Sequence, residues 1–257
     1  MSKQLSFWGE KLQGVLDKMV KPYPDRFVVF TQMDWSKIDD PHFSAEMVAQ
    51  LDDAVKRGSR ELKVWKDWGL GVKDKSGKLV PIDDPRMHPV WEECGNRGIP
   101  VAIHSTDPEA FFTTTDARNE RYEELMHNPS WSCYGAAFPA KQELLEQRNH
   151  VVAKHPHTTF VALHVANWPE NLDTVSDWLR QYPNKYVEFR REASGTGQAA
   201  LPRSEILRGV SGPHLVRDRF RAGARSVCEL LPVARNRRRV FSLLGLSWAG
   251  KMDDLRN

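Results

Sequence analysis

The sequence predicts an α/β protein built on a parallel sheet and arranged as a (β/α)8 barrel or part of one. Over residues 1–189, strand-like runs rich in β-branched and aromatic residues alternate with amphipathic helical segments. This alternation is typical of βα units with right-handed crossovers. The strand-like runs are apolar almost throughout, as expected for a sheet that is covered on both faces. No GxGxxG follows the first strand and no GxxxxGK[ST] occurs, which disfavours a nucleotide-binding fold.

Local patterns place the elements in order along the chain. The opening helix has one apolar face, made of Trp8, Leu12, Val15, Leu16 and Met19. The other expected helices cover residues 44–57, 87–97 and 139–154 and a segment that opens at Pro169. Ser44 is the expected N-cap of the second helix and Gly58 its end. The expected strands cover residues 26–31, 62–65, 100–105, 159–164 and 185–189.

Composition indicates an ordinary globular protein. The 257 residues include 37 Lys+Arg and 34 Asp+Glu, giving a formal net charge of +3. No apolar run reaches the length of a membrane span, and the first residues lack the apolar core of a signal peptide. Cys94, Cys133 and Cys228 are too widely spaced for a CxxC metal pair. We therefore expect a cytoplasmic protein with no membrane partner.

The charge is divided unevenly along the chain. Residues 1–189 carry a net charge of −5, whereas residues 190–257 carry +8, with 13 arginines. Such a segment is one signature of a nucleic-acid-binding arm. However, only Arg237, Arg238 and Arg239 form a cluster, and no nucleic-acid-binding motif accompanies them. We therefore expect no nucleic-acid partner.

Two histidines end consecutive strands in the same way. His104 closes Val-Ala-Ile-His and His164 closes Val-Ala-Leu-His. Equivalent positions on adjacent parallel strands would place both imidazoles at the carboxyl end of the sheet, where barrels keep their chemistry. Neutral imidazole is both a common metal ligand and a general base. The alternative, a hydrogen-bonded core histidine, is about equally favoured for this pair on the residues alone.

Other polar residues near the strand ends have weaker signals. Lys63, facing a barrel interior, could bridge metals as a carboxylated lysine or bind an anion, or could simply pack its aliphatic stem. Asp107 and Asp67 could orient a ligand imidazole or cap the following turn. His155 and His157 form an HxH pattern, but they lie where a helix enters a strand, at the end away from the catalytic side.

One connection is far longer than the others. Residues 105–138 separate a strand from the next helix and are rich in aromatic side chains, among them Phe111, Phe112 and Trp131. Connections of this length in a compact domain are usually functional or disordered. We expect this segment to form a lid or wall over a substrate site.

The motifs that surround these residues resemble the amidohydrolase-related family of TIM-barrel, metal-dependent hydrolases. This branch of the family also contains aminocarboxymuconate-semialdehyde-type decarboxylases. The similarity extends over about residues 8–189. It is carried by PYPDRFVVFTQMDW, LKVWKDWGLGVKD, IPVAIHSTDPEAFF, HNPSWS and FVALHVANWPENLD.

The resemblance implies a barrel with a divalent metal, usually zinc, at its carboxyl end. It matches His104 to the fifth-strand metal ligand and His164 to the sixth-strand ligand or acid/base residue. It matches Lys63 to a fourth-strand lysine that some branches carboxylate. Asp107 is the second candidate catalytic residue. In that chemistry the metal lowers the pKa of its bound water to about 7.

The family pattern is incomplete in this chain, since an HxH strand before the first helix and a Phe-Gly-Thr-Asp strand after residue 190 are both missing. Read one nucleotide later, codons for residues 212–220 can encode D-R-I-L-F-G-T-D-F, which contains the missing motif. We therefore expect residues 1–189 to hold about strands three to seven of an incomplete barrel. Residues 190–257 are then an irregular, Arg-rich tail translated out of frame.

Three functions remain open on the sequence. The first is metal-dependent hydrolysis of a small molecule, weakened by the incomplete ligand set. The second is non-oxidative decarboxylation by the same family of sites. The third is a truncated remnant without catalysis.

Overall fold

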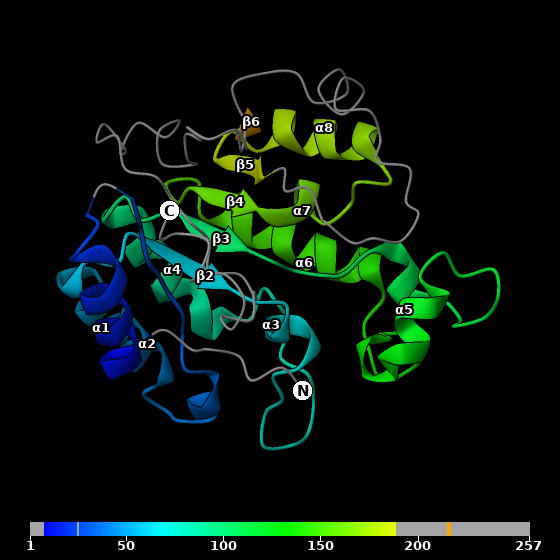
Figure 1. Ribbon diagram of the computed structural model, residues 1–257, viewed down its shortest axis with the longest axis horizontal. Coiled ribbons are helices and arrows are strands. Elements are labelled where there is room, and N and C mark those ends of the chain that lie inside the picture. The colour runs from blue at the N-terminus through cyan, green and yellow to red at the C-terminus, as the bar shows by residue number, and fades with distance from the viewer. Residues whose placement is uncertain (1–7, 25, 189–214, 217–257) are drawn as a thin grey trace, which may run out of the picture.

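The computed structural model describes residues 8–24, 26–188 and 215–216. Its centre is a six-stranded, all-parallel sheet whose strands follow one another in chain order (Figure 1). The strands are β1 (Phe30–Thr31), β2 (Glu61–Val64), β3 (Val101–Ile103), β4 (Phe160–Ala162), β5 (Lys185–Glu188) and β6 (Leu215–Val216). Parallel strands in sequential order, joined by helices, are the arrangement of a (β/α)8 barrel. The described strands form part of such a barrel, as predicted.

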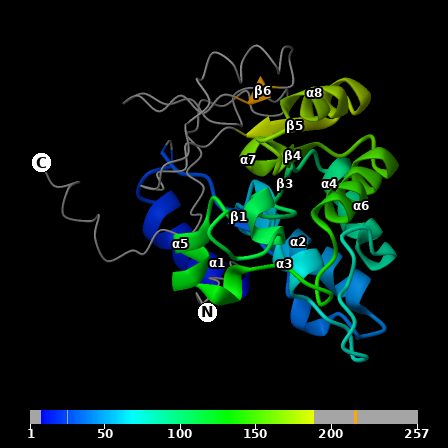
Figure 2. The same cartoon turned by 90° about the vertical axis from the view of Figure 1, so that its right-hand side faces the viewer.

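Helices connect successive strands and cover one face of the sheet (Figure 2). The longer helices are α2 (Phe43–Arg57), α4 (His88–Asn96), α6 (Lys141–Lys154) and α8 (Leu172–Gln181). The shorter α-helical segments are α1 (Gly9–Val15), α3 (Asp67–Leu70), α5 (Tyr122–His127) and α7 (Leu163–Ala166). A π-helical turn, Leu16–Val20, continues α1, and 3₁₀ turns occupy Trp35–Lys37, Pro85–Met87, Glu109–Phe112 and Pro129–Trp131.

The two faces of the sheet differ in composition. Alternate strand residues such as Leu62, Ile103 and Phe160 join the main apolar core with α2, α4, α6 and α8. The opposite face carries a smaller apolar group that includes Ala102 and Val161. Because side chains alternate along a strand, Lys63 lies on this second face, next to Ala102 in the pairing register. In a closed barrel, this second face of the sheet is the one that points to the interior.

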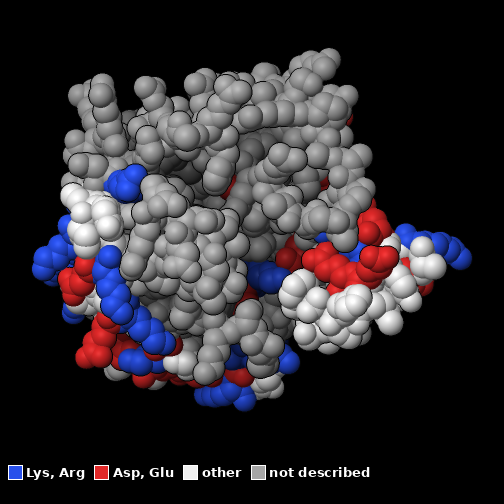
Figure 3. Space-filling view, in the orientation of Figure 1, with Lys and Arg blue, Asp and Glu red and all other residues white. Residues whose placement is uncertain are grey.

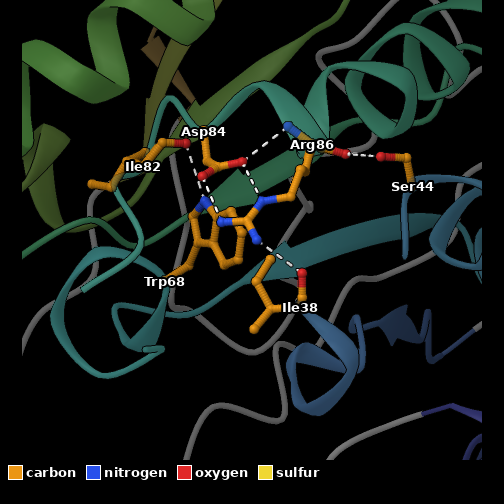
Figure 4. Close-up of polar contacts among 6 residues, drawn as sticks. All are labelled: Ile38, Ser44, Trp68, Ile82, Asp84 and Arg86. Carbon is orange, nitrogen blue, oxygen red and sulfur yellow. Dashed lines mark hydrogen bonds and ion pairs between the residues drawn. The ribbon is translucent and has the colours of Figure 1, made fainter. Parts of the chain in front are cut away.

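The expected N-cap at Ser44 is wrong. The helix α2 begins at Phe43, and the Ser44 hydroxyl instead donates to the carbonyl of Arg86, 2.8 Å away. Figure 4 shows why this contact forms: Arg86 forms a bidentate ion pair with Asp84 and donates to the Ile38 carbonyl at 2.9 Å. Ser44 therefore ties α2 to the segment before α4. The expected end of α2 at Gly58 is confirmed, with a φ of 122° at that glycine.

The long connection, residues 105–138, forms an arm around α5 that extends away from the sheet (Figure 1). Acidic side chains mark part of this arm in Figure 3, and α5 contributes Glu123 and Glu124. Met126 and Tyr134 on the arm are 54% and 55% exposed. The arm is therefore ordered local structure rather than an unstructured loop.

The predicted Arg-rich tail, residues 190–257, lies outside the described residues except for β6. That strand pairs in parallel with β5 through Val187–Leu215 and Glu188–Val216. The reading of the tail as out-of-frame sequence stays a prediction. Within the described part of the chain, no helix is both long and apolar enough to cross a membrane.

Candidate active site

The predicted site residues gather at the carboxyl ends of the central strands. His104 directly follows β3, and His164 lies in α7, directly after β4. The two imidazole rings face each other edge to face, with their centroids 4.7 Å apart. Both predicted histidines therefore lie at one site, on the side of the sheet where barrel enzymes act.

The strand register shows that the two histidines are not at equivalent positions. Ile103 pairs with Ala162, so His104 is one residue beyond this pair and His164 is two residues beyond it. In regular strands a one-residue offset would direct the two side chains to opposite faces. The prediction that the two histidines occupy equivalent strand positions is therefore wrong. The two rings still lie together, but a different backbone geometry brings them there.

A left-handed turn supplies that geometry. His164, Val165, Ala166 and Asn167 have φ values of 51°, 55°, 56° and 58°. None of them is glycine, and left-handed backbone costs about 1–2 kcal/mol for a residue such as His164, Val165 or Ala166, but less for Asn167. Four consecutive residues of this kind form a strained segment, and strain of this kind persists only where the surrounding structure holds it.

Three neighbouring elements hold the turn. The amide of His164 donates to Glu188 Oε2 at the end of β5, at 3.3 Å. The Asn167 side chain accepts from the amide of Ser105 at 3.0 Å, next to His104. Arg148 Nη1, from α6, donates to the Ala166 carbonyl at 2.6 Å. These contacts fix the position of His164 relative to β3.

Burial keeps the His104 imidazole neutral. Desolvation lowers its pKa well below the usual value, and the positive charges of Lys63 and Lys66 and the neighbouring His164 act in the same direction. A neutral imidazole retains a lone pair for a metal ion or a proton. His104 can therefore act as a ligand or accept a hydrogen bond, whereas the same burial makes it a weak base.

Lys63 is 2% exposed on the interior face of β2. Its ammonium group donates to the Val64 carbonyl at 3.2 Å and lies 4.6 Å from the centre of the Trp65 ring. Burial lowers the pKa of Lys63 well below its usual value, and the charge of Glu188 only partly opposes this shift. Lys63 also lies near enough to His104 for its charge to lower the pKa of that imidazole. Its bridging role stays a prediction.

Asp107 reaches the site through Lys66. Its Oδ2 forms an ion pair with Lys66 Nζ, whereas its Oδ1 lies 3.9 Å from His104 Nε2. That distance is too long for a hydrogen bond. Asp107 therefore anchors Lys66 beside His104 and makes no direct contact that would orient the imidazole. Asp67 is the first residue of α3, and its carbonyl accepts from the amides of Gly71 and Val72.

The aromatic residues of the long connection divide into two groups. Phe111 is 5% exposed and Phe112 packs on the main core, but Trp131 is 46% exposed on the arm. The amide of Cys133 donates to the Phe111 carbonyl at 2.8 Å, which returns the connection toward the site. Burial and the nearby Asp107 charge raise the pKa of the Cys133 thiol to about 11. The substrate-binding role of these aromatic residues stays a prediction.

The HxH pattern lies at the other end of the strands, as expected. His155 follows α6, before β4, and its Nε2 lies 2.9 Å from His88 Nδ1. Across the residues that the structure describes, no three His, Cys, Asp or Glu side chains converge so as to hold a metal ion. His104 and His164 are thus a pair of imidazoles and not a complete ligand set.

Three residues of the site were not predicted from the sequence. Glu188 could have been found, since it ends a strand at an interior-facing position, two residues after Tyr186. Asn167 and Arg148 had no such signal, because a polar residue in a turn and an arginine in a helix are both common. Their roles depend on the left-handed turn, and no pattern in the sequence predicts that turn.

The family follows from a comparison with known family models. Residues 14–214 match the model of a family described as amidohydrolase. The chain belongs to the amidohydrolase family. The match extends beyond residue 189, where the motif similarity was expected to end. Members of this family are enzymes, so the expectation of an enzyme is also met.

Among the solved structures similar to this chain, the first of the three below supports the fold. A dihydroxybenzoic acid decarboxylase from a Polaromonas species, with bound manganese and the inhibitor 2-nitroresorcinol, has a TM-score of 0.51 and 16% identity; the match covers 80% of this chain and 62% of that one. A 2,6-dihydroxybenzoate decarboxylase from Rhizobium has a TM-score of 0.46 and 16% identity, with 80% and 64% coverage. A TIM-barrel protein from Bordetella bronchiseptica has a TM-score of 0.42 and 20% identity, with 68% and 47% coverage.

The amidohydrolase-family chain described here thus spans about half to two thirds of the length of these structures. No functionally curated protein matches it in sequence.

Proposed function

We propose that this chain carries the central part of a metal-dependent hydrolase site that acts on a small molecule. The observation that supports this most is the pair of partly buried imidazoles at the carboxyl ends of β3 and β4, with ring centroids 4.7 Å apart. His104 and His164 are the proposed metal ligands. His164 is also the proposed residue that takes up or delivers a proton during the reaction.

The described residues fit such a metal only in part. Protein zinc sites use three or four protein ligands, whereas the described chain offers two nitrogen donors and no third convergent side chain. Further ligands would have to come from outside the described residues. We therefore assign no catalytic step to the metal and describe no coordination geometry for it. The proposed ion is divalent, and the family resemblance favours zinc.

The side chains around the histidines have proposed roles that do not depend on the metal. Neutral His104 can accept a hydrogen bond from substrate or water, because burial disfavours its charged form. Lys66, held by Asp107, places a cation at the edge of the site where an anionic substrate group would be stabilised. Phe111, Phe112 and Trp131 are the proposed wall of the substrate site.

Decarboxylation is the second candidate. The observation that favours it is the Polaromonas structure, which has the highest of the three TM-scores reported above and carries the name of a decarboxylase. Hydrolysis and decarboxylation need different substrates. Hydrolysis needs an ester or amide. Decarboxylation needs a carboxylate attached to a group that can delocalise the electron pair left when the carbon–carbon bond breaks and CO₂ leaves.

Metal binding is the first test. Isothermal titration of the metal-free full chain with Zn²⁺, and separately with Mn²⁺, should show binding that His104→Asn and His164→Asn each weaken by an order of magnitude or more. His150→Asn is the matched control, because the His150 side chain is 70% exposed and lies away from the site. Unchanged metal affinity in His104→Asn would overturn the proposal.

The reaction is tested separately. The metal-loaded chain is incubated with a panel of esters, lactones and amides, and with 2,6-dihydroxybenzoate, while acid production and CO₂ release are both measured. Acid production that His164→Asn abolishes supports hydrolysis, and CO₂ release supports decarboxylation instead. If neither product forms on a chain that binds metal, the chain is an inactive remnant and both catalytic proposals fail.

A further inference from the structure

The left-handed turn at residues 164–167 is the feature that carries a further inference. His164 stands one residue out of register with His104, and only the left-handed backbone brings the two rings together. The turn is strained at His164, Val165 and Ala166, whereas Asn167 tolerates the left-handed conformation. Whatever holds the turn therefore also determines where the His164 imidazole lies.

One of its contacts comes from a buried cation. Arg148 in α6 is 0% exposed, and its Nη1 donates to the Ala166 carbonyl at 2.6 Å. Its other guanidinium nitrogens, Nε and Nη2, donate to Asn149 Oδ1 at 3.3 and 3.1 Å. The guanidinium carbon also lies 4.9 Å from the centre of the Trp178 ring. The planar group is thus held by Asn149 and Trp178, and its third nitrogen, Nη1, is directed at the turn.

A second buried cation makes the same lateral contacts without reaching the turn. Lys185 is 0% exposed, its Nζ donates to Asn149 Oδ1 at 2.6 Å, and it lies 4.5 Å from the Trp178 ring centre. Arg148 and Lys185 therefore share an amide acceptor, Asn149 Oδ1, and an aromatic ring, Trp178. The hydrogen bond to Ala166 distinguishes the two.

We propose that Arg148 is a positioning residue that holds the 164–167 turn in its left-handed form and thereby places His164 beside His104. Arg148 does not touch the reacting atoms and acts only through the backbone of the turn. The value of this placement for catalysis rests on the proposed function, but the placement itself does not.

The geometric test uses the metal-free full chain. Nuclear Overhauser contacts between the ring protons of His104 and His164 report their proximity directly. Wild type should show this contact, and Arg148→Met should lose it because the turn relaxes. Lys185→Met is the matched control and should keep the contact. If Arg148→Met keeps it, or if Lys185→Met loses it equally, the proposal is overturned.

Relief of the backbone strain provides a rescue that a purely structural role would not show. Ala166→Gly removes the side chain that disfavours the left-handed conformation. In an Arg148→Met background it should restore the ring contact, and failure to do so would contradict the proposal. If Arg148→Met does not fold, Arg148→Lys with and without Ala166→Gly takes its place, with partial loss and recovery expected.

A Zn²⁺ titration of the same variants separates this inference from the proposed function. Arg148→Met should lower zinc affinity about 10–100-fold, the usual effect of removing a residue that supports a metal ligand, and Ala166→Gly should recover it. A wild-type chain that shows the ring contact but binds no zinc would refute the proposed metal site, and the ring contact would still decide the role of Arg148. Zinc affinity that is unchanged in Arg148→Met, on a wild type that binds zinc, would overturn the positioning role.

Discussion

His88 Nδ1 and His155 Nε2 lie 2.9 Å apart and join the start of α4 to the end of α6. Lys154 Nζ is 2.8 Å from the other nitrogen of His88. Because an ammonium group can only donate, His88 Nε2 must accept, His88 Nδ1 must carry the proton, and His155 Nε2 must accept in turn. The arrangement requires both imidazoles to be neutral.

Acid should therefore weaken this connection. Burial lowers the pKa of His155 to about 4, whereas an unfolded histidine titrates near 6.5. Between these values the unfolded chain binds a proton that the folded chain excludes, so stability falls as the pH falls from about 6.5 to 4. The loss from His155 should be on the order of 3 kcal/mol. Urea unfolding of wild type and His155→Asn at pH 7.5, 5.5 and 4.5 measures it.

The variant separates this effect from other titrations. At pH 7.5, His155→Asn should be less stable by about 1 kcal/mol, since a hydrogen bond is lost, but it should lose less stability than wild type on acidification. Parallel pH profiles for wild type and His155→Asn would disprove the prediction.

Asn184, just before β5, joins three backbone segments. Its Nδ2 donates to the carbonyls of Val152, His155 and Thr158 at distances of 2.9–3.1 Å. Asn184→Asp would replace these donors with an acceptor and leave the carbonyls facing a carboxylate. We expect a loss of about 2–3 kcal/mol in the free energy of unfolding, measured by chemical denaturation at pH 7.

The same substitution elsewhere provides the control. Asn171 caps α8 by accepting from the amide of Thr174 at 3.1 Å. Asn171→Asp preserves that acceptor and adds a negative charge at a helix N-terminus, so stability should be unchanged or slightly higher. Equal losses in both variants would mean that the donor role of Asn184 is unimportant.

The order of strands and the location of the site could be predicted from the sequence because they depend on short-range patterns. Alternating βα segments fix a parallel sheet, and a histidine after an apolar run is placed at the carboxyl end of its strand. The V-A-x-H pattern repeats at His104 and His164, which suggested equal registers. Pairing between strands is set by the packing of the whole sheet, and here it is shifted by one residue.

The supporting residues were not predictable for a related reason. Arg148 lies in α6, where a single arginine indicates an exposed helical position, yet it is fully buried. Its role becomes clear only when α6, Trp178 and the turn after β4 are placed together. Long-range contacts of this kind leave no periodic signal in one sequence.

Removing the Lys63 charge should not destabilise the protein. Burial lowers the pKa of Lys63, and the only hydrogen bond of its Nζ within the described residues is to the Val64 carbonyl. Below its usual pKa, the unfolded chain favours the protonated form more than the folded chain does, so the lysine lowers stability at neutral pH. Lys63→Met should therefore be at least as stable as wild type at pH 7 by thermal unfolding. A loss of more than about 1 kcal/mol would indicate a structural ion pair instead.

Gly69, in α3, should tolerate an added methyl group poorly. Its φ is 110°, and a Cβ at this position would lie 2.7 Å from Ile82 Cγ1 and 3.3 Å from Leu144 Cδ2, both in the main core. Gly69→Ala therefore combines backbone strain with overpacking and should cost about 2–4 kcal/mol.

Gly77 separates these two causes. Its φ is 82°, but a Cβ there would meet no atom within 4 Å, so Gly77→Ala should cost only the backbone term, about 1 kcal/mol. Chemical denaturation of both variants gives the two losses in the free energy of unfolding. The difference between them is the free-energy cost of displacing Ile82 and Leu144 in the core between α3 and α6. If the two variants lose equal stability, then the core accommodates the extra methyl group and close packing at Gly69 does not constrain this position.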